Sequence, residues 1–420
     1  MKRNQFIKQY ASDARWFLEL KKIKAPLVLH SYRLSKDFLD NQYNLFISDQ
    51  VRNPEVQPFL YSESDVRLAQ DRLIELRSMI LQEEQEKSIS QAYIRNIDFK
   101  LKELNMLMAS LAVDCVAFKK ANQSLYDSLQ QEVVDDILYK LNTKYNSFFP
   151  KATPVENLQK LRSKISTLPL ENFSTLLPFD TLDVDKSSLY QANTVCAMWS
   201  EVLAEVAPAW KCELSDEFQH MHVNIRKRLV SIPNKAKFRG SRINKMLFHE
   251  IGTHVLRREN GKKSKLQLLS IGLDNYQPAE EGLSIMMEQI VGGSFKDFGG
   301  LDKYLALMIA KGYVDGIERD FRDTFIMLRD YFVARKRVRH NSDDATRIAN
   351  ERAWAICWRI FRGGKPEIPG CCFMKDKIYR EGNILMWNLF INNNKHFSNV
   401  SAGKFNPADS QHRKLVEKYT

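Results

Sequence analysis

The chain has 420 residues, of which 44% are hydrophobic and 27% charged, so its composition is that of a folded protein and excludes an intrinsically disordered one. Its 16 glycines and 13 prolines also exclude collagen-like and low-complexity sequence. A formal net charge of +12 favours acidic partners, although basic residues spread over a solvated surface would give the same value. Because the basic clusters at 226–228 and 335–337 are short, we do not expect nucleic acid as a partner.

The chain offers no segment for membrane insertion or secretion. No uncharged apolar run approaches the roughly 18 residues of a membrane span, and the first residues lack the apolar core of a secretory signal. The six cysteines do not suggest a disulfide framework, because four are scattered and Cys371 and Cys372 are adjacent. We therefore expect a reduced, cytoplasmic location. The sequence does not indicate the oligomeric state.

Residues 64–145 are predicted to be helical almost throughout. The first helix opens at Ser64 and places apolar residues three or four positions apart up to Ile80. Two further stretches with the same spacing cover residues 92–118 and 125–142. We interpret these helices as a scaffold, with the binding of a partner as the alternative.

A break follows, with Pro150, Pro154 and a segment rich in Ser, Thr and Leu. We predict a mainly helical N-terminal region over 1–150 and a second domain over 151–420. In the second domain, alternation over 219–231 predicts a strand, followed by a loop. Helices should start near Ser241 and Pro278, and several more should fill 301–362. The predicted fold is α+β and predominantly helical, with a small sheet and an N-terminal helical extension.

Three residues of the segment HEIGTH are candidates for a metal-dependent hydrolase. His249 and His254 supply two imidazole ligands, and Glu250 supplies a carboxylate that could act as a base. The histidines lie five residues apart, whereas the common H-E-x-x-H motif places them four apart on one helix face. A π-type turn, with hydrogen bonds from i to i+5, would bring them together, and Gly252 lies where such a distortion is easiest.

The next predicted helix supplies a candidate third ligand. Pro278 suits the first turn of a helix, and Glu280, Glu281 and Gly282 follow it directly. Glu281 at the start of an otherwise apolar helix can point into a buried site, and Gly282 would let another backbone come close. The alternative is that both glutamates only stabilise the helix N-terminus.

These residues resemble the family of the microtubule-associated tyrosine carboxypeptidase, whose bacterial relatives carry a QEGLA motif and are described as flavohaemoglobin expression-modulating proteins. The resemblance covers most of residues 220–385 and only faintly the first half of the chain. The motifs that carry it are HEIGTH at 249–254, Asn260-Gly261, Gly272-Leu273, Tyr276, EEGLS at 280–284, RIFRGG at 359–364, KDKIYREG at 375–382 and, loosely, FLYSES at 59–64.

The resemblance implies a zincin-like catalytic domain in which one Zn²⁺ is bound by His249, His254 and Glu281. Glu250 would be the catalytic base that assists the attack of a zinc-bound water on the peptide carbonyl. The expected function is a zinc-dependent metallocarboxypeptidase that removes a C-terminal Tyr or Phe from a peptide or protein tail. The positive net charge would suit an acidic tail, such as that of tubulin.

Further residues complete the predicted site. An oxyanion needs a donor beside the metal, and Tyr379 is a candidate that would reach in from a loop, with a buried structural tyrosine as the alternative. Arg362 and Lys375 are candidates for binding the substrate's C-terminal carboxylate, with a helix-end Arg and a surface Lys as the alternatives. The strand at 222–226 could pair with the substrate backbone.

The sequence departs from the QEGLA pattern at Glu280 and Ser284, and KKSKLQLL replaces the usual Gln-Pro-Leu after Asn-Gly. These changes spare the ligands but put the substrate pocket in doubt. An aminopeptidase would need acidic residues for the substrate amine, which Glu280 and Glu288 could supply. A non-enzymatic regulator with a structural zinc site is a further alternative. The presence of Glu250 argues against the regulator, because a structural site needs no general base.

Overall fold

The computed structural model describes residues 11–23, 35–55, 62–145, 149–170, 173, 176–217, 221–337, 342–392, 394–397 and 399–420. Helices predominate in these residues, and the strands form two small sheets, which confirms the predicted helical α+β class. None of the described helices is both long and apolar enough to span a membrane. Of the FLYSES segment, residues 59–61 lie outside the described residues.

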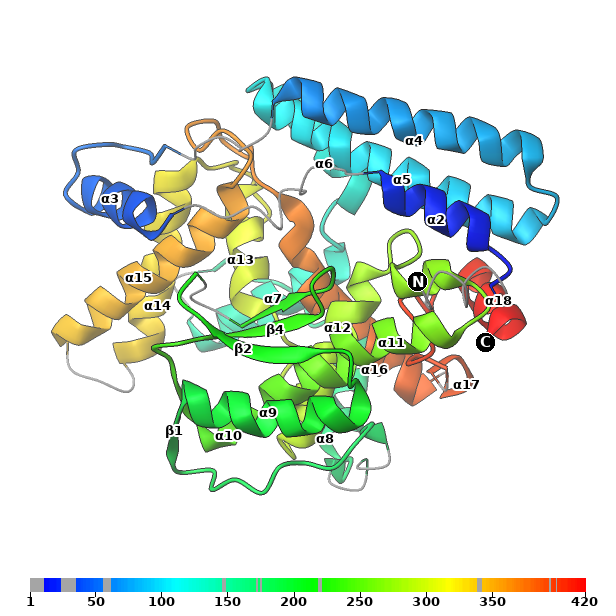
Figure 1. The fold of residues 1–420 in the computed structure, drawn as a ribbon. Coiled ribbons are helices and arrows are strands. Elements are labelled where there is room, and N and C mark those ends of the chain that lie inside the picture. The colour runs from blue at the N-terminus through cyan, green and yellow to red at the C-terminus, as the bar shows by residue number, and fades with distance from the viewer. Residues whose placement is uncertain are drawn as a thin grey trace.

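The N-terminal region is helical, as predicted. Figure 1 shows α4 and α5 packed side by side along one edge of the molecule. Helix α4 begins at Glu63 rather than Ser64, because Ser62 is its N-cap: the Ser62 hydroxyl accepts from the Asp65 backbone N–H, and the Asp65 carboxylate accepts from the Ser62 backbone N–H. The helices are α2 (Ala14–Lys22), α3 (Lys36–Ile47), α4 (Glu63–Glu83), α5 (Lys87–Leu111), α6 (Cys115–Tyr126), α7 (Gln131–Lys144) and α8 (Glu156–Ser166).

The predicted single strand over 219–231 is wrong in detail. Its first two residues lie outside the described residues, and the rest forms a hairpin of β3 (His222–Asn224) and β4 (Leu229–Pro233). The turn forms because the Asn224 side chain accepts from the Lys227 backbone N–H at 3.0 Å, and Arg228 adopts a left-handed φ of 53°. The sheet order is β2-β4-β3, with β2 (Lys211–Ser215) parallel to β4.

The predicted loop after β4 contains a short strand. This strand, β5 (Lys237–Arg239), pairs antiparallel with β1 (Leu189–Gln191) to form the second sheet. Helices near Ser241 and Pro278 and across 301–362 are confirmed. The remaining helical elements are α9 (Ala192–Val206), α10 (Gly240–Leu247), η3 (Phe248–Val255), α11 (Leu256–Lys263), η4 (Gln267–Ser270), α12 (Gln277–Val291), α13 (Leu301–Ala310), α14 (Phe321–Arg337), α15 (Ser342–Phe361), η5 (Met374–Lys377), α16 (Ile378–Asn392), α17 (Asn394–Phe397) and α18 (Ser410–Tyr419).

Helices α12 and α16 pack closely in the middle of the molecule (Figure 1). A Cβ on Gly282 would overlap the Gly382 carbonyl, and one on Gly382 would overlap the Pro278 carbonyl oxygen. The two backbones can therefore approach only because both positions are glycine. The Asn383 amide also donates to the Gly282 carbonyl at 3.3 Å. The close approach predicted for Gly282 is confirmed, and it fixes the position of the neighbouring Glu281.

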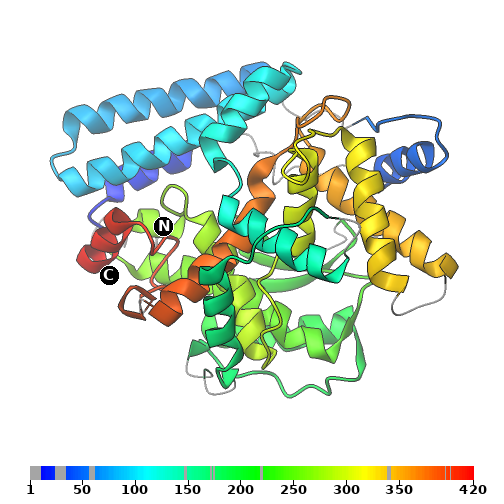
Figure 2. The same cartoon turned by 180° about the vertical axis from the view of Figure 1, so that it is seen from behind.

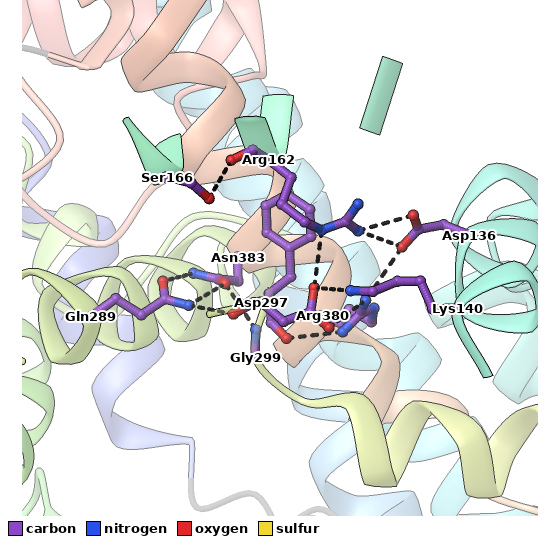
Figure 3. A network of polar contacts seen from close by, with 10 residues as sticks. Asp136, Lys140, Arg162, Ser166, Gln289, Asp297, Gly299, Arg380 and Asn383 are labelled. Atoms are coloured by element: carbon purple, nitrogen blue, oxygen red, sulfur yellow. Dashed lines mark hydrogen bonds and ion pairs between the residues drawn. The ribbon is translucent and has the colours of Figure 1, made fainter. Parts of the chain in front are cut away.

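A polar network joins α7 and α8 to α16 (Figure 3). Arg162 donates to both Asp136 oxygens at 2.7 and 2.9 Å, and fully buried Arg380 lies 3.5 Å from Asp136 and 3.4 Å from Asp297. Figure 2 shows α7 and α8 beside α16 from behind. Asp136 belongs to the predicted N-terminal region, so contacts cross residue 150. The division at that residue stays a prediction.

A disulfide between Cys115 and Cys371 joins the start of α6 to the segment before η5. The expectation of reduced cysteines is therefore wrong for Cys115 and Cys371, whose separation of 256 residues gave no sign of a pair. The other four cysteines are free. The disulfide attaches the N-terminal helices to the segment that carries Lys375.

Candidate metal centre

The HEIGTH residues form a π-helix, η3, between α10 and α11. The Leu256 N–H donates to the Ile251 carbonyl, five residues back, and the Thr253 hydroxyl donates to the Phe248 carbonyl at 3.0 Å. This wider turn places the His249 and His254 rings on one side, with their centroids 5.1 Å apart. The π-type turn predicted from the five-residue spacing is confirmed.

His249, His254 and Glu281 come together in one cluster. One potential ligand atom from each lies within 4.8 Å of the other two, and the His249 Nε2 lies 3.9 Å from a Glu281 oxygen. Two imidazoles and one carboxylate are a donor set that Zn²⁺ accepts in hydrolases, where a fourth position stays open for water or substrate. In the described part of the chain this is the one such group of three. The residues present therefore fit the metal that the sequence predicted.

A second carboxylate supports each histidine. The His249 Nδ1 lies 2.6 Å from a Glu288 oxygen, and the His254 Nδ1 lies 3.0 Å from a Glu280 oxygen. Such contacts fix the ring orientation and place the N–H on Nδ1, which leaves Nε2 as the ligand atom. Burial lowers the pKa of His249, but the hydrogen bond that His249 donates to Glu288 and the charges of Glu250 and Glu288 raise it to about 9 in the metal-free protein.

Glu280 is buried and surrounded by cations. The Lys404 Nζ lies 2.6 Å from its Oε1, and the Arg257 guanidinium donates to its Oε2. Burial raises the pKa of this carboxyl, but Lys404, Arg257 and His254 together hold it well below its usual range. Glu280 and Glu288, the two carboxylates that the aminopeptidase alternative assigned to a substrate amine, are thus both engaged by the histidines.

Glu250 lies on η3 directly after His249 and is partly exposed. No hydrogen bond joins its carboxylate to another described residue, and its negative charge acts on the His249 ring. Glu281 lies on α12 at the glycine crossing. Burial raises the pKa of Glu281, while the charges of His254, Lys375 and His249 bring it below its usual value. The surroundings of Glu281 therefore favour its anionic form.

Tyr379 occupies the first turn of α16, not the loop that the sequence suggested. Arg359 donates to its hydroxyl oxygen at 2.9 Å and also pairs with Asp376. The Lys303 Nζ lies 3.9 Å from the centre of the Tyr379 ring. Sequence reasoning missed Arg359 and Lys303. Arg359 is the first residue of the RIFRGG motif, so the sequence could have indicated it, whereas Lys303 lies in no motif.

Arg362 directly follows the end of α15, as its helix-end alternative has it, whereas Lys375 is more buried than a surface lysine. The Nε and Nη2 atoms of Arg362 are buried and have no hydrogen-bond partner in the described part of the chain, and burial lowers the pKa of its guanidinium. Lys375 is 6% exposed and is not a surface lysine. Burial lowers its pKa, and the charge of Glu281 acts in the opposite direction. Arg362 is thus partly buried and Lys375 is buried, and Lys375 is electrostatically coupled to the cluster.

One family model matches the chain: microtubule-associated tyrosine carboxypeptidase, over residues 44–298. The match covers more than half of the sequence and includes His249, Glu250, His254 and Glu281, while residues 299–420 lie outside it. No curated protein and no solved structure matches the chain.

Proposed function

The chain belongs to the microtubule-associated tyrosine carboxypeptidase family, and from this premise we propose that it is a zinc-dependent carboxypeptidase that removes a C-terminal Tyr or Phe. The observation that carries the proposal is the cluster of His249, His254 and Glu281, in which each histidine is held through Nδ1 by a carboxylate. Bound Zn²⁺ would polarise the scissile carbonyl and make a water molecule more acidic.

Glu250 is the proposed base. It follows a ligand on the same π-helix, is partly exposed and is not engaged by another described side chain. It would accept a proton from the attacking water and return it to the nitrogen of the departing amino acid. Glu281 and Glu280 are less suited to this role, because the first belongs to the cluster and the second is paired with Lys404 and Arg257.

Arg362 and Lys375 are the proposed ligands of the substrate's terminal carboxylate. The Nε and Nη2 atoms of Arg362 are buried without a hydrogen-bond partner among the described residues, which is costly. A bidentate carboxylate would satisfy both. Tyr379 is the proposed oxyanion donor: its oxygen already accepts from Arg359, so its own proton remains free to donate.

The preceding residues of the substrate would lie along β3. This strand pairs only with β4 in the described part of its sheet, and it packs against η3. A peptide could therefore add to the edge of β3 that faces away from β4. The turn after β3 carries exposed Arg226 and Lys227, which suit an acidic tail. Together with the family's association with microtubules, this favours the C-terminal tail of tubulin as the substrate in the cytoplasm.

The test is the substitution Glu250→Gln. We expect the variant to keep one zinc per chain and to lose about 10²- to 10⁴-fold in the release of Tyr from a peptide, because only proton transfer is removed. Zinc is measured by elemental analysis, and mass spectrometry of a mixed peptide pool reports which end is cut. Release of N-terminal residues would favour an aminopeptidase. If zinc-loaded wild-type protein cuts no peptide, the carboxypeptidase proposal is wrong.

A further inference from the structure

The segment from Val400 to Phe405 contacts Arg257 and Glu280, which lie next to the metal cluster. It lies outside the family match. The Arg257 side chain donates to the Val400 carbonyl at 2.9 Å and to the Phe405 carbonyl at 2.8 Å. The backbone of Lys404 is fixed in both directions, since its N–H donates to Leu269 at 2.8 Å and its carbonyl accepts from Leu273 at 2.9 Å. This segment is therefore held by hydrogen bonds to Arg257, in the helix that follows the π-helix.

Lys404 extends from this segment to the carboxylate that supports His254. Its Nζ lies 2.6 Å from the Glu280 Oε1, the same oxygen that lies 3.0 Å from the His254 Nδ1. The side chains of Lys404 and Glu280 are 2% and 4% exposed, so solvent does not compete for either. A buried ammonium group is stable only when it is paired. The position of this lysine is consequently coupled to that of the carboxylate.

Arg257 acts on the other oxygen of Glu280. With Arg257 alone, the carboxylate would be held only at Oε2, and Oε1 would be free to turn away from the imidazole. Lys404 prevents this rotation by holding Oε1 at the histidine. The two cations therefore have separate tasks: Arg257 binds Oε2, and Lys404 fixes the oxygen that orients the ring.

We propose that Lys404 is a positioning residue of the metal centre, which holds Glu280 against His254 so that the Nε2 of that ring faces His249 and Glu281. The metal-binding unit then extends beyond the matched residues 44–298 to the segment 400–405. The inference rests on the proposed zinc site. Lys404 acts through Glu280 and does not touch the substrate.

The substitution Lys404→Met tests whether Lys404 strengthens or weakens zinc binding. Methionine keeps the length of the side chain but cannot hold Oε1, so we expect zinc affinity to fall about tenfold. If Lys404 were only a positive charge near the cluster, its removal would strengthen the binding of a cation. Zinc affinity is measured by competition with a chromogenic chelator. Unchanged or tighter zinc binding by folded Lys404→Met would overturn the proposal.

A double-mutant cycle with Glu280→Gln tests whether Lys404 acts through this carboxylate. We expect Lys404→Met to change zinc affinity less than threefold in the Glu280→Gln background, because the two substitutions disturb one interaction. If the two substitutions lower zinc affinity by factors that multiply in the double variant, the two residues act independently and the proposal is wrong. Lys140→Met is the control: its Nζ lies 2.6 Å from Asp297, in the network of Figure 3, and not from a carboxylate that supports a histidine. This substitution should lower stability without changing zinc affinity.

Hydrogen exchange of wild-type protein covers the case in which Lys404→Met does not fold. Because coupling is reciprocal, zinc should slow exchange of the Lys404 amide, which donates to Leu269. Equal exchange of segment 400–405 with and without zinc would refute the coupling. The two proposals fail separately: wild-type protein that binds no zinc contradicts the proposed function, whereas zinc binding that is indifferent to Lys404 contradicts only this inference.

Discussion

The two histidines of the cluster make the same kind of hydrogen bond in different surroundings. His249 is supported by Glu288, whose side chain is 36% exposed, while His254 is supported by Glu280, which is 4% exposed. Water can stabilise the charge of Glu288, but Glu280 depends on Arg257 and Lys404. One support is thus a local contact at the surface, and the other is part of the interior. Removing them should have different consequences for stability.

The largest effect is expected for Glu280→Gln. The substitution leaves the buried cations Arg257 and Lys404 beside a neutral amide, so we expect a loss of about 3–5 kcal/mol in the free energy of unfolding. Urea denaturation of the metal-free protein measures it. Adding Lys404→Met should restore part of the stability, because one unpaired charge disappears. If Glu280→Gln is as stable as wild type, the buried carboxylate Glu280 does not contribute more to stability than the partly exposed Glu288.

A smaller effect is expected for Glu288→Gln. The stability of the metal-free protein should change by less than about 1 kcal/mol, because this carboxylate is partly solvated. Zinc affinity should nevertheless fall about tenfold, since the neutral amide supports the His249 ring less well. Chelator competition at constant pH gives the affinity. A stability loss as large as that of Glu280→Gln would mean that exposure does not distinguish the supports.

The smallest effect concerns pH. In the metal-free protein the pKa of His249 is raised to about 9, so its protonated form is stabilised by folding. This contribution, about 0.5 kcal/mol after solvent screening at Glu288, is complete below the unfolded pKa of about 6.5 and is lost as pH rises through 9. Urea denaturation at pH 6 and pH 9.5 should show the decline. The decline should be smaller in Glu288→Gln, which loses the hydrogen bond to Glu288 but keeps the charge of Glu250. An unchanged decline there would assign the effect to another group.

Local features of the sequence predicted the core of the site. The five-residue spacing of the histidines around Gly252 indicated the π-helix, and Gly282 indicated the approach of another backbone, which is that of Gly382. Both features depend on residues that are close in sequence or on a property of one residue type. For this reason they could be recognised without knowing the fold.

The remaining support could not be predicted in this way. Lys404 contacts Glu280, which lies 124 residues earlier in the chain. Neither a periodic pattern nor a motif indicates such a contact. Glu288 was considered only as a ligand of a substrate amine. Its position about two helical turns after Glu281 does not by itself show that it contacts His249. The turn at Arg228 was missed because its left-handed backbone is rare for arginine.

The distance between Glu280 and Lys404 along the chain also orders events during synthesis. At about 5–20 residues per second, translation of the 124 residues from Glu280 to Lys404 takes roughly 6–25 s. Throughout that interval the histidines, Glu281 and Glu280 already exist, but the ammonium group that fixes Glu280 does not. A nascent chain can therefore meet zinc before its binding site is fully assembled, and the mature geometry is a late product of folding.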